Sequence, residues 1–175
     1  MALSDILRKG IVTSTFLIGL VGPTYNTIDN KLEFQRAEAR EIRIVDSDKL
    51  YLELSLNERL KYDEATKISA NKKYDEATKI LKELLLNNNS PLFFYMLGHI
   101  NRFQDNLPEA IFYFKKAISF EPNYIDAHGI LSKVYFEFED CKNAIIEAET
   151  FLRLAPDHKN AEVKRQYIQE CKQKS

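Results

Sequence analysis

A set of small residues and prolines recurs in the second half of this chain with a period of 34 residues. Ala110 and Ala144 differ by 34 in residue number, and so do Pro122 and Pro156. A period of this length is typical of stacked supersecondary units, because one unit alone cannot bury its apolar face and needs a neighbour. The period therefore predicts a solenoid, a row of similar units that share one core and present one extended inner surface.

The residues within one period fit two antiparallel helices in close contact. Gly98 on the first helix and Ala110 and Ala117 on the second are small enough to let the backbones approach, and Phe114 fills space between them. Pro122 ends the second helix, because the residue before a proline is disfavoured in the α region. A chance amphipathic helix would show only the 3.6-residue periodicity. We therefore predict an all-α chain built from helical hairpins.

The full set of spacings resembles the tetratricopeptide repeat (TPR). It is carried by Phe94, Leu97, Gly98, Asn101, Ala110, Phe114, Ala117 and Pro122 in one unit, and by Leu131, Ser132, Tyr135, Ala144, Ala148, Phe151 and Pro156 in the next. An earlier unit matches more weakly, because Lys61 and Glu64 stand where the family has large apolar residues. The resemblance implies about three TPR units within residues 58–158, whose first helices line a groove that holds a peptide or another protein. The units are 58–90, 91–124 and 125–158.

By the same resemblance, four positions of each first helix face the groove. In this chain they are Leu92, Tyr95, His99 and Arg102 in one unit, and Asp126, Gly129, Lys133 and Phe136 in the next. This mixture of apolar, aromatic and cationic side chains suits a peptide that carries apolar anchors and some acidic residues. Tyr95 and His99 do not supply the Lys and Asn pair with which related repeats hold the carboxy-terminal carboxylate of heat-shock chaperones. An alternative role for Tyr95 and Phe136 is packing between helices.

The amino-terminal residues 1–28 have the pattern of a membrane anchor. Residues 10–28 contain no charged side chain, and Arg8 and Lys9 precede them. As a helix this run would be about 28 Å long, against roughly 30 Å of bilayer hydrocarbon. We predict an anchor helix whose basic flank favours the positive-inside face, with the repeats on the other side. A cleaved signal peptide, a mitochondrial presequence, and a helix packed against the repeats or a partner are the alternatives.

A second, shorter resemblance concerns the same end of the chain. It is carried by Leu3, Asp5, Ile6, Lys9, Thr13, Ser14, Gly22, Phe34, Gln35 and Ala39. These residues resemble the small single-span assembly factors for cytochrome c oxidase, although those factors lack the repeats. The resemblance implies a chaperone-like role in building a complex of the mitochondrial inner membrane. A bacterial inner membrane and the cytosol are the alternative locations.

The remaining segments complete the predicted organisation. Residues 29–57 form a charged helical connector, and residues 159–175 form a capping helix whose polar outer face ends the solenoid. The octapeptide KYDEATKI occurs twice, at 61–68 and at 73–80. A break near residue 70 would allow each copy to use its own helix face, since an offset of 12 residues on one helix would rotate the copy by about 120°.

Composition and motifs exclude several classes of function. The formal net charge of −1, without a long basic run, argues against nucleic acid binding. Cys141 and Cys171 form no zinc pattern, and we expect no structural disulfide. His99, His128 and His158 are not spaced with cysteines or carboxylates as metal ligands. Because no nucleophile or phosphate-binding motif is present, we predict no catalysis, no metal and no cofactor.

Two functions fit this organisation. The first is a membrane-anchored, non-catalytic scaffold that binds protein and assists the assembly of a membrane protein complex. The alternative is a soluble chaperone, similar to the small three-repeat chaperones of secretion systems, in which residues 1–28 act as a docking helix. A membrane fraction that resists salt extraction would argue against the soluble chaperone.

Overall fold

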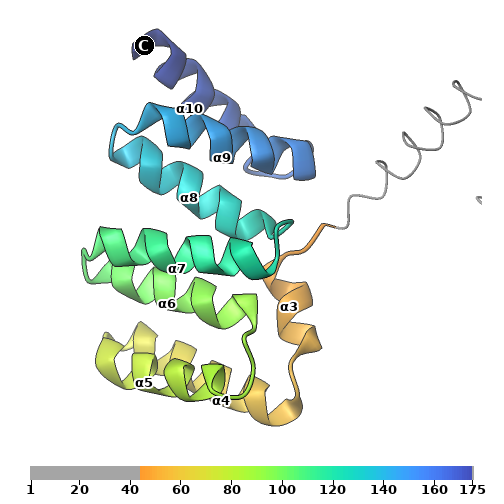
Figure 1. Ribbon diagram of the computed structural model, residues 1–175, viewed down its shortest axis with the longest axis vertical. Coiled ribbons are helices and arrows are strands. Elements are labelled where there is room, and N and C mark those ends of the chain that lie inside the picture. Colours follow the sequence, from red (N-terminus) through yellow and green to blue (C-terminus); the bar gives the residue numbers. More distant parts are fainter. Residues whose placement is uncertain (1–43, 175) are drawn as a thin grey trace, which may run out of the picture. The chain divides into compact units, whose positions relative to one another are not determined.

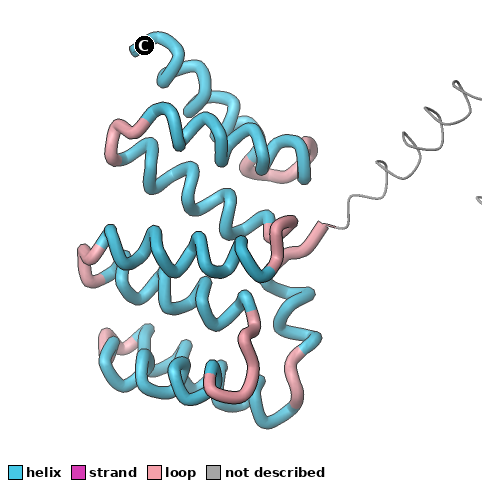
Figure 2. Tube along the Cα trace, viewed as in Figure 1, coloured by secondary structure: helices cyan, strands magenta, loops and turns pink. Residues whose placement is uncertain are grey.

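The computed structural model describes residues 44–174, and Figure 1 shows that they form a stack of helices. The eight helices in this part of the chain are α3 (Ser47–Glu53), α4 (Leu56–Ala70), α5 (Tyr74–Leu85), α6 (Pro91–Phe103), α7 (Leu107–Phe120), α8 (Ile125–Glu137), α9 (Cys141–Leu154) and α10 (Ala161–Lys174). Short loops connect them (Figure 2). Among the described residues, the β-type pairing is limited to a single bridge between Val45 and Tyr124. The predicted all-α fold is confirmed for this part of the chain.

The predicted anchor helix at 1–28 lies outside the described residues. Within residues 44–174, no helix is long and apolar enough to cross a membrane. The structure describes only the end of the predicted connector, which contains α3. Helix α3 ends at Glu53, and Ser55 starts α4 through a capping box in which its hydroxyl and the Glu58 carboxylate bind each other's backbone N–H groups.

Small residues allow the two helices of each pair to approach. A Cβ atom added to Gly98 of α6 would lie 2.6 Å from ring atoms of Phe114 on α7, which is closer than atomic packing tolerates. In the first pair, Ala65 of α4 and Ala77 of α5 are fully buried. The first unit therefore pairs its helices like the others, even though Lys61 replaces a large apolar residue.

The turn inside each pair contains one non-glycine residue with a positive φ angle. Lys72, Asp105 and Glu139 have φ angles of 62°, 57° and 58°. Each lies in the left-handed region, which costs a non-glycine residue roughly 1–2 kcal/mol. The first of these turns separates the two octapeptide copies, since α4 ends at Ala70 and α5 begins at Tyr74. The predicted break near residue 70 is confirmed.

The expectation that the cysteines form no disulfide was wrong. Cys141, the first residue of α9, is bonded to Cys171 near the end of α10, with 5.1 Å between the Cα atoms. Helix α10 runs back along α9 in the opposite direction, and this brings residues 30 positions apart together. Cys171 is fully buried, so it is not part of a frayed terminus.

Candidate functional site

The candidate site is the face formed by α4, α6 and α8, the first helices of the three pairs, which we call the first-helix face. It carries all the residues predicted to line the groove: Leu92, Tyr95, His99, Arg102, Asp126, Gly129, Lys133 and Phe136. Their surroundings divide them into two groups. Residues of the first group are held in contacts with other parts of the chain, and those of the second group are partly exposed.

Residues 44–54, which we call the strap, cover part of this face. The N–H of Ile125 donates to the carbonyl of Val45 at 2.9 Å, and the N–H of Val45 donates to the loop before α8 at 3.3 Å. Ser47 donates two hydrogen bonds to Oδ2 of Asp126, from its backbone N–H at 2.8 Å and from Oγ at 2.7 Å. The carboxylate of Asp126, a predicted groove residue, therefore binds the strap of the same chain.

Helix α3, which forms most of the strap, also contacts the first two units. The Tyr51 ring lies 6.0 Å from the Tyr62 ring of α4, and its hydroxyl donates to Asp63 at 2.8 Å. The Arg59 guanidinium donates to two carbonyl groups of the strap, at 2.7 and 2.9 Å. Leu92 of α6 is only 1% exposed and lies in a cluster with the buried leucines of the strap. Leu92 thus belongs to the core and offers a partner no surface.

Tyr95 and His99 pack against each other, with 4.6 Å between the ring centroids. Tyr95 also lies 5.1 Å from the Tyr124 ring, and both residues contact Phe114. Burial raises the pKa of Tyr95. Burial, with the positive charge of Arg102 nearby, lowers the pKa of His99 to about 4. Packing between helices, the alternative role of Tyr95, is what the structure shows for both side chains.

Arg102, Lys133 and Phe136 form the second group, which is partly exposed and lies near the carboxyl ends of α6 and α8. The Lys133 side chain is 44% exposed, and its Nζ lies 3.6 Å from a carboxylate oxygen of Glu137. The Arg102 guanidinium lies over the Phe103 ring at 5.3 Å. Its Nε is buried and makes no hydrogen bond within the described part of the chain. A buried donor without an acceptor costs free energy.

Helix α10 adds two residues to this group. Tyr167 stacks on Phe136 with 4.3 Å between the centroids and 17° between the planes. The ammonium of Lys174 lies 6.0 Å from the centre of the Phe136 ring. Tyr167 follows Lys133 by 34 residues, so extending the period by one more helix would have identified it. We call Arg102, Lys133, Phe136, Tyr167 and Lys174 the open face.

Helix α10 also covers Gly129, the remaining predicted groove position. The ammonium of Lys164 donates a hydrogen bond of 2.7 Å to the Gly129 carbonyl and lies over the Tyr167 ring at 4.9 Å. Burial, with a smaller effect from the charge of Lys133, lowers the pKa of Lys164 to about 8. Gly129 is therefore covered from the side of α10 and cannot contact a partner while this helix is in place.

The other two histidines have structural contacts. His128 is 6% exposed, with Nδ1 at 2.6 Å from the Glu147 carboxylate and Nε2 at 3.0 Å from a backbone carbonyl. The His158 ring packs edge-on against Phe151. Among residues 44–174, no group of three or more His, Cys, Asp or Glu side chains could hold a metal ion. What the site offers is apolar, aromatic and cationic contact surface.

Comparisons with known proteins agree with this architecture. The sequence profile of the tetratricopeptide repeat matches residues 93–124, which include α7 and most of α6. The fold is similar to that of SycD, a type III secretion translocator chaperone of Yersinia enterocolitica, with a TM-score of 0.59 and 15% sequence identity. The match covers 77% of this chain and 90% of SycD. Comparison with curated proteins finds no match. Residues 93–124 therefore match a tetratricopeptide repeat, and this repeat lies between two helix pairs of similar build.

Proposed function

We propose that this chain is a non-catalytic, chaperone-type scaffold that binds an extended segment of a partner protein at the open face. The observation that carries the proposal is the strap. Val45, Leu50 and Leu54 are buried against the repeats, while the acidic side chains of Asp46 and Glu53 stay more accessible. Because the repeats bind the strap in this way, we infer that a partner segment has the same pattern, with apolar anchors separated by acidic residues.

The open face complements such a segment. Its cations, Arg102, Lys133 and Lys174, would attract acidic side chains, and the stacked pair of Phe136 and Tyr167 would receive an apolar anchor. Because the strap fills the part of the first-helix face near Asp126, the proposed site is confined to the carboxyl ends of α6 and α8 together with α10. A site of that extent suits a short peptide segment better than a folded domain.

The similarity in fold favours the soluble chaperone of the two functions predicted from the sequence. SycD is described as a translocator chaperone, and its match extends over 77% of this chain. A shared fold allows a shared mode of binding but does not name a partner. The partner proposed for this chain is therefore defined only by the chemistry of the open face.

A photo-reactive residue on the open face tests the proposal. p-Benzoylphenylalanine replaces Phe136 in one variant and Phe112, which lies on α7 and is 48% exposed, in the matched control. We expect partner adducts from position 136 and not from position 112. Adding Lys133→Glu should reduce the adducts by about tenfold or more, because it reverses a charge on the open face. Equal adducts at both positions, or adducts that Lys133→Glu leaves unchanged, would contradict the proposal.

The second proposal is that the same scaffold is anchored in a membrane and assists the assembly of a membrane complex, with the mitochondrial inner membrane as the first choice. The uncharged run at residues 10–28 favours it. Alkaline carbonate extraction of the full chain beside a version that begins at Asn26 tests it. Retention of the full chain alone in the membrane pellet supports an anchor, and extraction of both supports the soluble chaperone.

A further inference from the structure

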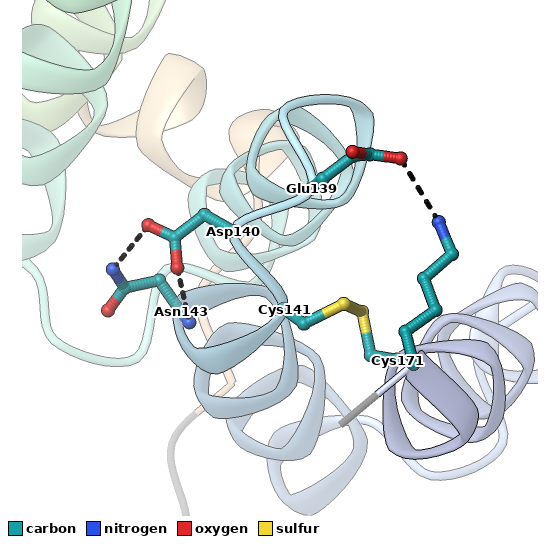
Figure 3. The surroundings of a disulfide bond; sticks show 6 residues. Glu139, Asp140, Cys141, Asn143 and Cys171 are labelled. Carbon is teal, nitrogen blue, oxygen red and sulfur yellow. Dashed lines mark hydrogen bonds and ion pairs between the residues drawn. A yellow bond between two sulfur atoms is a disulfide. The ribbon is translucent and has the colours of Figure 1, made fainter.

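Besides the backbone that connects it to α9, helix α10 is joined to the repeats by one disulfide bond, between Cys141 and Cys171 (Figure 3). The bond connects the first turn of α9 to the last turns of α10. An ion pair of 3.3 Å between Lys174 and Glu139 crosses the same junction, and both of its side chains are more than half exposed. Exposed ion pairs contribute little to stability, so the disulfide is the strong connection at this end of α10.

The non-covalent packing of α10 is thin. Its buried residues are Ala161, Lys164 and Cys171, and Val163 is 41% exposed. Helix α9, by contrast, buries Phe151 and three other apolar residues. One of the three buried residues of α10 is a lysine, whose ammonium faces two aromatic rings and a carbonyl group. Apart from the stack of Tyr167 on Phe136, α10 buries little apolar surface, so we expect it to open at a small cost in free energy once the disulfide is cut.

The surface beneath α10 is a repeat-stacking surface. Lys164 covers the Gly129 backbone of α8, and Tyr167 covers one side of the Phe136 ring. In a longer solenoid, the first helix of a fourth unit would occupy this place. Release of α10 would uncover this end of the stack and remove Tyr167 and Lys174 from the open face.

We propose that the Cys141–Cys171 disulfide is a redox-sensitive clasp, and that its reduction releases α10 from the third repeat. This regulation goes beyond the binding proposed above. Release of α10 can be measured without a partner, so its test does not depend on the proposed function. In the oxidised protein α10 stays packed on the third repeat, and the open face keeps all five of its residues. In the reduced protein α10 leaves the third repeat, and the surface that it covered is exposed.

The chemistry requires a dithiol reductant, either a small molecule or a dithiol oxidoreductase. Cys141 is partly exposed and Cys171 is fully buried, so a thiolate of the reductant attacks Sγ of Cys141. The S–S bond breaks, and Cys171 leaves as a thiolate that takes up a proton. The second thiol of the reductant then attacks the mixed disulfide and releases Cys141. Two electrons and two protons pass to the cysteines, and the reductant becomes a disulfide.

Lysine acylation read by mass spectrometry tests the proposal on the full chain. The oxidised and dithiothreitol-reduced proteins are labelled at one pH, and two lysines are compared. Lys164 of α10 is 5% exposed and buried against α8, and Lys133 of α8 is 44% exposed in the closed state. We expect reduction to accelerate labelling of Lys164 by about tenfold or more, with a change of less than about twofold at Lys133. The double variant Cys141→Ser/Cys171→Ser should label like the reduced protein with or without dithiothreitol.

Three results would overturn the proposal. Slow labelling of Lys164 in both the reduced protein and the double variant would mean that packing alone holds α10. Loss of amide hydrogen-exchange protection in α6 and α7 on reduction would mean that the bond holds the whole stack and not the cap. Two free thiols in the protein isolated under alkylating, non-reducing conditions would mean that the clasp does not form.

Discussion

The imidazole of His99 makes the stability of this fold depend on pH. It lies among aromatic rings, and burial lowers its pKa from 6.5 to about 4. Between these two values the unfolded chain binds a proton that the folded chain excludes, so the free energy of unfolding falls as the pH drops from about 6.5 towards 4. The loss is at most a few kcal/mol, since each pKa unit corresponds to about 1.4 kcal/mol. Urea titrations from pH 7 to pH 4.5 should show the fall, and His99→Gln should flatten it. An equal slope in the variant would contradict this account.

Gly98 is the residue at which added volume should be least tolerated. A Cβ atom there meets the Phe114 ring at 2.6 Å, whereas at Gly129 it meets Phe151 at 3.1 Å. Alanine gains roughly 1 kcal/mol of helix propensity at either site, and overpacking costs about 1–3 kcal/mol. We expect Gly98→Ala to lower the free energy of unfolding by up to about 2 kcal/mol and Gly129→Ala to be nearly neutral. Denaturant unfolding measures both, and Phe114→Leu should rescue Gly98→Ala. Equal effects at the two glycines would show that the contact with Phe114 relaxes freely.

At the scale of the element, the repeat period predicted the helix pairs because their contacts are local and recur. Gly98, Ala110 and Phe114 belong to one hairpin, and the same spacing one unit later identifies the next. The strap could not be predicted in this way. Its partner Asp126 lies 79 residues from Ser47, and no repeat specifies that contact. Its leucines alternate in sequence, so neither a helical face nor a groove contact is evident from the pattern.

The residues of the candidate site could be predicted only in part from the sequence. The spacing assigned Arg102, Lys133 and Phe136 to a face that the structure leaves accessible. It assigned Leu92 and Asp126 to the same face, where the strap covers them. Sequence spacing identifies which side of a helix a residue occupies, but it does not reveal which other segment lies on that side. The disulfide was missed for the same reason, because it depends on the direction of α10.

The hydrogen bonds between the strap and α8 should contribute measurably to stability. Asp126 accepts two hydrogen bonds from Ser47, and a carboxylate acceptor strengthens each of them. We expect Asp126→Ala to lower the free energy of unfolding by about 1–3 kcal/mol. Glu149→Ala, at an exposed position of α9, should change it by less than about 0.5 kcal/mol. A double-mutant cycle with Ser47→Ala should be strongly non-additive, and additivity would show that the two residues do not interact in solution.

At the scale of the whole molecule, the strap changes how the repeats depend on one another. In an ordinary solenoid each unit contacts only its neighbours, and stability is close to a sum of unit and interface terms. Here Arg59 of the first unit and Asp126 of the third both bind the strap. Residues 44–54 therefore couple the first unit to the third directly, and unfolding of either unit releases strap contacts with the other.

This coupling predicts a loss of cooperativity when the strap is detached. Val45→Asp combined with Leu50→Asp places charges at positions that are 1% and 4% exposed, so the strap should leave the face. Without it the first pair should unfold before the third, and the urea transition should broaden with a lower apparent m-value. Hydrogen exchange followed by mass spectrometry should show α4 and α5 losing protection before α8 and α9. A lower midpoint with an unchanged m-value would instead mean that the strap stabilises the stack without linking its ends.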